Sequence, residues 1–295
     1  MTSTPPTDWP RQTRIRANGL EHHVFEWDPD GEPRGSIVLT HGWLDHGAGF
    51  AALAARLAAA GWRVRAFDWR GHGRTEHVGA GGYYHFPDYV LDLAELLPQL
   101  CPDERPVLVG HSMGGTASAM FAGTFPQALR ALVLLEGLGP PESDLAIPDR
   151  FAVWIDGVRR ERKRPARVLR DADEALARMR RHHPELPDEL GRRLVAHATR
   201  PAPDGEGIVF TYDRLHHTRA PIPFSKVAFR AFLERITVPV LFVAAARGMR
   251  LPDEDERLNW IRNARRVVLE DCGHMMQWTA PDRLADVMLE FVARV

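Results

Sequence analysis

The chain has 295 residues, of which 44% are hydrophobic and 26% are charged, and its formal net charge at pH 7 is −1. A chain of this length can bury a large core, and its balanced charge excludes a general attraction to nucleic acid or anionic lipid. No apolar run approaches the roughly 18 residues that a membrane helix needs, and residues 1–12 lack the apolar stretch of a signal peptide. We therefore expect a cytoplasmic globular protein that has neither nucleic-acid nor membrane partners.

Two cysteines, Cys101 and Cys272, are too few for a disulfide framework and favour a reducing compartment. Cys272 lies two residues before a candidate catalytic histidine, His274. Nothing nearby in the sequence is of a kind that lowers the pKa of a thiol, so we expect a buried structural cysteine there.

Short apolar runs alternate with helical stretches along most of the chain. Such runs, each apolar throughout, predict a mostly parallel sheet that is covered by helices on both faces. The expected strands are 36–40, 62–73 (ending in a Gly-rich turn), 106–110, 131–137, 238–246 and 264–274, and the expected helices are 51–62, 87–100, 114–126 and 281–295.

The alternation breaks at residues 140–236, which are rich in Arg, His and Pro and contain one clear helical pattern at 172–181. Within it, residues 156–200 carry 13 Lys/Arg against 8 Asp/Glu, a local charge of +5. With little aromatic interleaving, this charge predicts a solvated helical face rather than a nucleic-acid site. We therefore divide the chain into a core (1–139 and 237–295) and a cap, or lid, at 140–236. The cap is expected over the C-terminal edge of the sheet, where open α/β sheets place their sites.

Residues 110–114 form a GxSxG stretch, Gly110-His111-Ser112-Met113-Gly114, between an apolar strand and a small-residue helix. This is the context that a nucleophile elbow requires. The strained turn lifts the Ser112 hydroxyl out of the sheet, and side chains at 110 and 114 would collide with neighbouring backbone. The helix N-terminus favours a developing oxyanion, so Ser112 is the candidate nucleophile.

A serine nucleophile needs a general base, and one of the 14 histidines has a suitable context. His274 follows the last expected strand and precedes the final helix, so a loop off that strand can return the imidazole to Ser112. Most other histidines are expected to be solvated, above all four in the cap segment: His182, His183, His216 and His217.

Over residues from about 20 to 295 the chain resembles an α/β-hydrolase. It is most similar to serine-hydrolase-like enzymes, relatives of the haloalkane dehalogenases and epoxide hydrolases. The resemblance rests on HGWLDHGAGF (41–50), FDWRGHGRT (67–75) and GHSMGG (110–115). It implies an α/β-hydrolase fold with a mainly helical cap insertion, and an oxyanion hole formed by the backbone N–H groups of Trp43 and Met113.

The resemblance also implies an acidic residue in the loop after the strand 238–246, but Arg247 and Gly248 stand there. Glu136 is the candidate instead, because it follows five apolar residues at the end of a buried strand. Burying its charge there is costly unless it is paired, and His274 would supply the partner. Some members of the fold, including many haloalkane dehalogenases, carry the acid after this earlier strand.

Three other acids remain open as alternatives. Asp253 and Asp255 lie in a run that looks like a helix start, where acids are expected for dipole reasons alone. Asp271 lies three residues before His274, so one strand would have to present both groups face to face.

Further polar residues have structural or weak functional interpretations. Asp68 ends a strand before a Gly-rich turn, which we expect it to anchor by hydrogen bonds. Asp45 and His46 follow the oxyanion loop and could face the cavity, although the signal is weak.

No metal or cofactor is expected. The adjacent pairs His22/His23 and His216/His217 lack supporting ligand spacing, and there is no GxGxxG or Walker pattern.

A serine at 112 argues against dehalogenase and epoxide hydrolase activities, which use an aspartate nucleophile, and favours acyl transfer. We therefore predict a serine carboxylesterase that cleaves a small acyl substrate through Ser112, His274 and Glu136. The alternatives are a lactonase, thioesterase or C–C bond hydrolase with the same triad, or a fold member that binds a ligand without turnover. The substrate depends on how cap residues such as Phe151, Trp154 and Phe224 shape the pocket.

Overall fold

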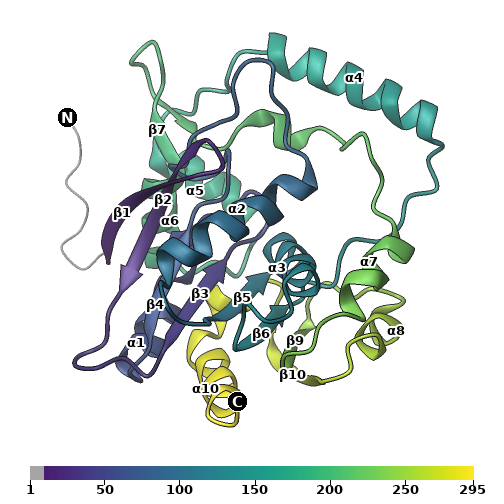
Figure 1. The fold of residues 1–295 in the computed structure, drawn as a ribbon. Helices are drawn as coiled ribbons and strands as arrows, with labels where there is room; N and C mark the ends of the chain where they lie inside the picture. The colour runs from purple at the N-terminus through teal and green to yellow at the C-terminus, as the bar shows by residue number, and fades with distance from the viewer. Residues whose placement is uncertain (1–9) are drawn as a thin grey trace.

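The computed structural model of the protein describes residues 10–295, so most of the segment on which the signal-peptide expectation rests lies outside the described residues. The main sheet has eight strands in the order β1-β2-β4-β3-β5-β6-β9-β10 (Figure 1). These strands are β1 (Arg11–Ala17), β2 (Leu20–Trp27), β3 (Ser36–Thr40), β4 (Arg63–Phe67), β5 (Val107–His111), β6 (Ala131–Leu135), β9 (Val240–Arg247) and β10 (Ala264–Gly273).

The strands from β4 to β10 pair in parallel, and β1 and β2 pair antiparallel at one edge. The mostly parallel sheet and the six strands expected from the sequence are therefore confirmed. The strands β1 and β2 were not expected from the sequence. The strand β1 is largely polar, and Ala17 is its only buried residue. Their hairpin signal was Asn18-Gly19, which turns with positive φ angles of 46° and 76°.

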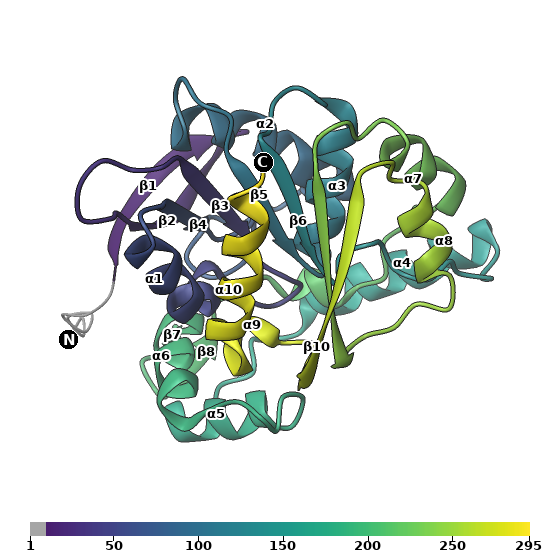
Figure 2. The ribbon, with the colours of Figure 1, turned by 90° about the horizontal axis from the view of Figure 1, so that it is seen from below.

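Helices cover both faces of the sheet (Figure 2). The helices α1 (Ala51–Ala59) and α10 (Pro281–Val292) pack together on one face. The other face carries α2 (Phe86–Leu100), α3 (Met113–Thr124) and α7 (Lys226–Leu233). Shorter helical segments at the strand ends are η1 (Gly47–Phe50), η2 (Arg214–His217), α8 (Glu254–Asn259) and α9 (Met276–Thr279).

Strand register brings the chemistry-bearing segments to one edge. His111 at the end of β5 pairs with Leu135 at the end of β6, and Leu135 pairs with Val243 of β9. The residues that follow β5 and β6 are Ser112 and Glu136, so they leave the sheet as neighbours at its C-terminal edge.

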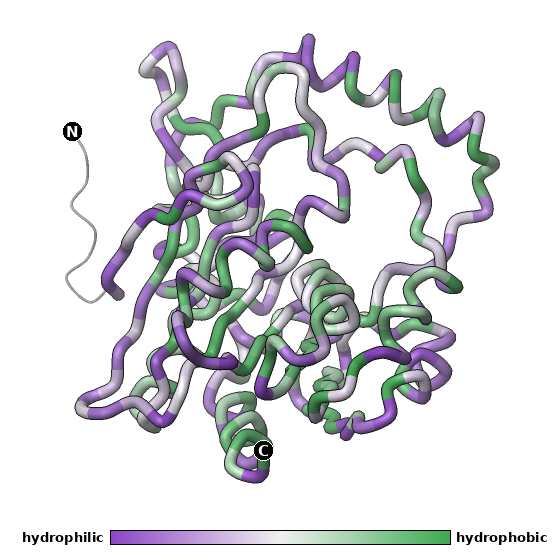
Figure 3. Tube along the Cα trace, viewed as in Figure 1, coloured by the Kyte–Doolittle hydropathy of each residue, from purple (hydrophilic) through white to green (hydrophobic). Residues whose placement is uncertain are grey.

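The segment between β6 and α7 contains α4 (Ile147–Lys163), α5 (Ala172–Arg180), α6 (Asp188–Ala198), and a hairpin of β7 (Thr199–Pro201) and β8 (Ile208–Phe210). Figure 3 shows α4 as a mixture of hydrophilic and hydrophobic residues far from the apolar strands. By contrast α7 packs on α3 within the core, with Phe229 and Leu233 buried, although it falls inside the predicted cap range 140–236. The division into core and cap stays a prediction.

None of the helices formed by residues 10–295 combines the length and the apolar character that a membrane span requires.

The contact between α3 and α7 depends on a glycine. A Cβ at Gly123 would lie 2.3 Å from the carbonyl oxygen of Phe232. We expect Gly123→Ala to lower the free energy of unfolding by about 1 to 2 kcal/mol, because overpacking outweighs the better helix propensity of alanine. Urea denaturation measures the difference.

Gly81→Ala is the matched control, because a Cβ at Gly81 meets nothing within 4 Å. It should change the free energy of unfolding by less than about 0.5 kcal/mol. Equal denaturation midpoints for the two variants would contradict the tight helix contact.

Candidate active site

Ser112 lies in the sharp turn between β5 and α3, with φ 52° and ψ −115°. Neighbouring glycines make this turn possible. A Cβ at Gly110 would lie 2.5 Å from the Cα of Gly115, and one at Gly114 would lie 2.5 Å from the carbonyl oxygen of Thr40. The turn therefore tolerates no side chains at these two positions, as the elbow interpretation requires.

The turn also places backbone donors around Ser112. Met113 is the first residue of α3, so its N–H group has no acceptor within the helix. The loop containing Gly42 and Trp43 lies alongside, since a Cβ at Gly42 would lie 3.2 Å from the Cβ of Ser112. Both segments from which oxyanion donors were expected therefore adjoin Ser112.

His274 follows β10 and is held on two sides. Its Nδ1 lies 2.5 Å from Oε2 of Glu136. Its carbonyl oxygen accepts a hydrogen bond of 2.9 Å from Nε2 of His111, the residue directly before Ser112. Burial lowers the pKa of His111 well below its ordinary value, so this ring is neutral and donates through Nε2. His111 thus fastens the His274 loop to the nucleophile turn, a role that the sequence did not reveal.

Glu136, also at a positive φ of 49°, lies at the centre of the site. Its Oε1 accepts a hydrogen bond from the N–H group of Ala245 at 2.8 Å, and its Oε2 accepts one from Met249 at 2.9 Å. A Cβ at Gly248 would lie 1.8 Å from Oε1. The end of β9 and the loop after it, where the resemblance implies an acid, therefore supply space and donors for the carboxylate of Glu136.

The three alternative acids form ion pairs with arginines instead of with His274. The side chain of Asp271 is 87% exposed, and Asp253 and Asp255 belong to the start of α8. Their partners are Arg257 for Asp253 (3.0 Å), Arg266 for Asp255 (2.6 Å) and Arg283 for Asp271 (3.4 Å).

Comparison with known proteins identifies the family of the chain. Residues 35–281 match the family model described as alpha/beta hydrolase fold. The chain belongs to the α/β-hydrolase family. The hydrolase is 28% identical over 285 residues to a "Serine hydrolase-like protein" of Danio rerio, an alignment that covers 90% of this chain and 83% of the relative. The predicted family and fold are thereby confirmed.

Two further relatives extend the comparison. A "Monoacylglycerol lipase" of Mycolicibacterium smegmatis is 31% identical over 186 residues, covering 57% of this chain and 64% of the lipase. Among solved structures, the "Thioesterase Domain From Curacin Biosynthetic Pathway" matches with a TM-score of 0.83 and 25% identity, covering 95% of this chain and 98% of that one. The protein is thus a hydrolase of the α/β fold, and this family membership supports a small-molecule substrate.

In the hydrolase the loop between α5 and α6 lies over the His274 segment. The ring of His183 is 5.1 Å from that of Trp278, and a Cβ at Gly273 would lie 2.5 Å from Oε1 of Glu185. Burial lowers the pKa of His183, so this residue is not the solvated histidine that the sequence suggested.

Another cap histidine also differs from the expectation of solvent exposure. His216 packs between the rings of His72 and Tyr84, at centroid distances of 4.0 and 3.9 Å. Burial lowers its pKa to about 4. By contrast His182 is exposed, as expected.

The cap residues expected to shape the pocket separate into two places. Phe151 and Trp154 form an edge-to-face pair on α4, with ring centroids 5.9 Å apart. Phe224 instead packs on Gly139 and Arg257, at the end of β6 and on α8.

Asp68 anchors its Gly-rich turn and also contacts α6, in the predicted cap. It accepts hydrogen bonds from the N–H groups of Gly47 (2.7 Å) and Arg74 (2.8 Å), as expected for a turn anchor. It also lies 2.8 Å from Nε2 of His197 on α6. Burial alone would raise the pKa of Asp68, but the charge and hydrogen bond of His197 hold it well below its ordinary value.

One group within residues 10–295 brings three metal-ligand side chains together, and the sequence did not single it out. The ligand atoms of His46, Asp68 and His197 lie within 4.8 Å of one another. Two imidazoles and a carboxylate are a donor set that zinc accepts. However, both oxygens of Asp68 already accept backbone hydrogen bonds, so the group as it stands serves as a buried polar link.

The buried cysteines match their structural interpretation. Cys101 and Cys272 are both free and buried, and burial raises the pKa of each thiol, that of Cys101 to about 11. Neither is therefore disposed to form a thiolate.

Asp45 and His46 are buried. The carboxylate of Asp45 lies beside Gly49 and Trp278, and its Oδ2 has no hydrogen-bond partner. Burial raises the pKa of Asp45 from 3.8 to about 7. The folded state therefore binds a proton that the unfolded chain releases between these pH values, and stability falls as pH rises from about 4 to about 7.

We expect Asp45→Asn to raise the free energy of unfolding at pH 8 by about 1 to 3 kcal/mol, because it removes the cost of protonating or burying this carboxyl. Near pH 4 the variant and the wild type should differ little. Urea denaturation at the two pH values measures both. Asp271→Asn, at an exposed carboxylate, is the control and should show no pH-dependent difference. A loss of stability in Asp45→Asn at pH 8 would contradict the assignment.

Proposed function

We propose that the protein is a serine carboxylesterase that cleaves an ester or similar acyl compound through a covalent acyl-enzyme, with Ser112, His274 and Glu136 as its catalytic residues. The observation that carries this proposal is the pairing of His274 Nδ1 with the Glu136 carboxylate beside the Ser112 turn. A carboxylate on Nδ1 leaves Nε2 of the imidazole unprotonated, so that Nε2 can act as the base toward the nucleophile.

The reaction begins when Oγ of Ser112 attacks the acyl carbon and Nε2 of His274 takes its proton. The carbonyl oxygen becomes an oxyanion, which the N–H groups of Trp43 and Met113 stabilise. As the tetrahedral intermediate collapses, His274 gives the proton to the leaving oxygen and the acyl group stays on Ser112. A water molecule then gives a proton to His274 and attacks the acyl-enzyme. His274 returns that proton to Oγ of Ser112 as the bond between Oγ and the acyl carbon breaks, which releases the acid and restores the serine.

Glu136 has a positioning and an electrostatic part in this scheme. It selects the His274 tautomer that is protonated on Nδ1, and it stabilises the imidazolium that forms in each half-reaction. Its own negative charge is stabilised by the N–H groups of Ala245 and Met249. The names of the serine hydrolase-like and lipase relatives support the same chemistry.

A thioesterase with the same catalytic residues is the second candidate, because a solved thioesterase domain matches nearly the whole chain. The two functions differ in the leaving atom. Comparison of kcat/KM for an oxygen ester and a thioester of the same acyl group separates them.

Ser112→Ala should abolish turnover of 4-nitrophenyl butyrate and labelling by a fluorophosphonate probe. Glu136→Gln should lower kcat by about 1,000- to 10,000-fold, because the amide cannot stabilise the imidazolium. Asp253→Asn and Asp255→Asn are the matched controls, and each should retain kcat within about threefold. The hydrolase proposal fails if the wild type neither turns over acyl substrates nor reacts with the probe, and the choice of acid fails if a control loses more activity than Glu136→Gln.

The position of the acid has a separate test. Gly248→Asp alone should lower kcat at least about tenfold, because its Cβ occupies the place of Oε1 of Glu136. Combined with Glu136→Gly, the same substitution should restore kcat at least about tenfold over Glu136→Gly alone, since the acid then returns to the loop after β9. If the kcat of Gly248→Asp equals that of the wild type, the Glu136 carboxylate does not lie beside Gly248 during turnover.

A further inference from the structure

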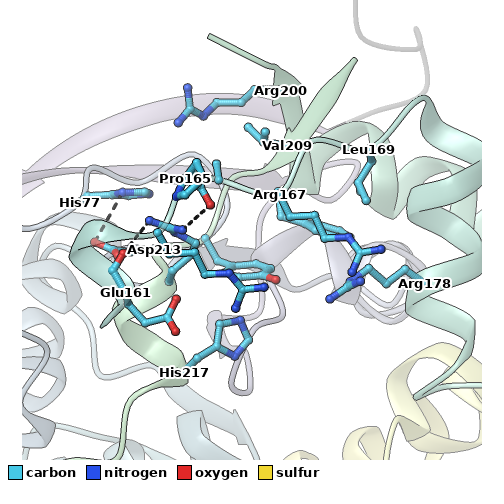
Figure 4. Close-up of a pocket in the computed structure, with 15 residues that line it drawn as sticks. His77, Glu161, Pro165, Arg167, Leu169, Arg178, Arg200, Val209, Asp213 and His217 are labelled. Carbon is cyan, nitrogen blue, oxygen red and sulfur yellow. Dashed lines mark hydrogen bonds and ion pairs between the residues drawn. The ribbon is translucent and has the colours of Figure 1, made fainter. Parts of the chain in front are cut away.

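A pocket of about 520 Å³ lies in the predicted cap, between the end of α4, the segment leading to α5, the β7–β8 hairpin and η2 (Figure 4). This volume is in the range of small-molecule sites. Its walls include neither Ser112, Glu136 nor His274. Five arginines line it: Arg164, Arg167, Arg178, Arg200 and Arg214.

The two carboxylates in the wall do not neutralise these arginines. Glu161 pairs at 3.3 Å with Arg160, which is not among the residues that line the pocket. Asp213 accepts a hydrogen bond of 2.8 Å from the hydroxyl of Tyr84. Arg214 itself donates to two main-chain carbonyl oxygens, at 2.7 Å each. The pocket therefore keeps its positive charge.

The other four arginines have no ion pair with any carboxylate among residues 10–295. Figure 4 shows the side chains of Arg167 and Arg178 pointing toward one another, from the segment before α5 and from α5 itself. Arg164, Arg167 and Arg200 are exposed and Arg178 is half-buried. Cations gathered on a concave surface produce a positive potential that attracts an anion. Guanidinium groups are also suited to bidentate binding of a carboxylate or a phosphate.

The field of these arginines acts on a histidine in the same wall. Burial lowers the pKa of His217, the charge of Glu161 raises it, and Arg178, Arg164 and Arg214 lower it. The arginines and Glu161 therefore act on this ring in opposite directions.

The pocket is continuous with the loop that flanks Ser112. The ring of His217 meets the ring of Trp43 edge to face, with centroids 5.8 Å apart. The indole Nε1 of Trp43 donates a hydrogen bond of 3.1 Å to the carbonyl oxygen of His216. Gly42, the residue before Trp43, lies directly against Ser112. His217 thus connects the wall of the pocket to the segment from which the proposed oxyanion donor comes.

We propose that this pocket binds an anionic group, a carboxylate or a phosphate, carried by the substrate whose acyl bond Ser112 cleaves. The inference rests on the proposed function, and it names the class of substrate as an anionic acyl compound. The anionic group is on the acyl part or on the leaving group, and the same arginines would bind it in either case.

Three chromogenic esters test the inference. They are 4-nitrophenyl butyrate, which is neutral, mono(4-nitrophenyl) glutarate, with its charge on the acyl part, and 3-carboxy-4-nitrophenyl butyrate, with its charge on the leaving group. For one of the charged esters, kcat/KM of the wild type should exceed that for the neutral ester by about tenfold or more. The charged ester that shows the preference identifies the side that carries the anion.

Arg178→Gln and Arg164→Gln should each lower that preference by about tenfold, since each removes one charge-assisted contact. Arg159→Gln is the matched control, because Arg159 is an exposed arginine of α4 outside the pocket. It should leave the preference unchanged. Added salt should reduce the preference in the wild type more than in Arg178→Gln.

The inference is overturned if neither charged ester is preferred, or if Arg178→Gln, Arg164→Gln and Arg159→Gln behave alike while the esters are turned over. Failure of the proposed function has a different signature, namely no turnover of any ester and no fluorophosphonate labelling. In that case calorimetry with inorganic phosphate and with glutarate decides the inference. Binding that Arg178→Gln weakens about tenfold supports an anion site, and absence of binding to the wild type overturns it.

Discussion

The arrangement of the site depends on the hydrogen bonds that the Glu136 carboxylate accepts. It lies at the end of a buried strand, where a charge is costly unless several donors surround it. Three hydrogen bonds meet that requirement, from the N–H groups of Ala245 and Met249 and from the imidazole of His274. They join the ends of β6, β9 and β10, so one side chain aligns three loops. Gly248 is part of the same constraint, because any side chain there would occupy the place of the carboxylate.

The predicted cap meets the rest of the chain through apolar packing as well as through polar contacts. Leu176 of α5 and Leu194 of α6 belong to the same buried hydrophobic cluster as Trp278. His197 of α6 reaches Asp68 in the core, and the loop after α5 covers the segment around Gly273. On the other side, His216 and His217 hold the indole of Trp43. The arginine-lined pocket is built from the same cap segments, so its position relative to Ser112 follows from these contacts. The excess positive charge of the segment is thereby gathered into a concave surface as well as spread over a solvated face.

Much of the fold could be predicted, because the parallel strands are apolar in contiguous runs and the helices between them have their own periodicity. The β1–β2 hairpin could not be found by that rule, since β1 exposes alternate polar residues at the sheet edge. The sharp turn at Ser112 was predictable from the GxSxG pattern. The contact at Gly110 is local, with Gly115, whereas Gly114 is restricted by the distant carbonyl oxygen of Thr40. His111 was missed, because its hydrogen bond runs to a carbonyl group 163 positions away.

The sequence by itself determined the family, the parallel sheet and the strained turn at Ser112, since each depends on residues that are close together in the chain. It also narrowed the acid to a few candidates, among which Glu136 was favoured because an isolated buried charge requires a partner. Only the tertiary structure decided which carboxylate lies on His274, because Glu136 and His274 are 138 positions apart and meet through strand register. The same holds for the arginines of the cap. Their positive charge is visible in the sequence, but whether they face solvent or converge on a pocket is decided by how α4, α5 and the β7–β8 hairpin pack together.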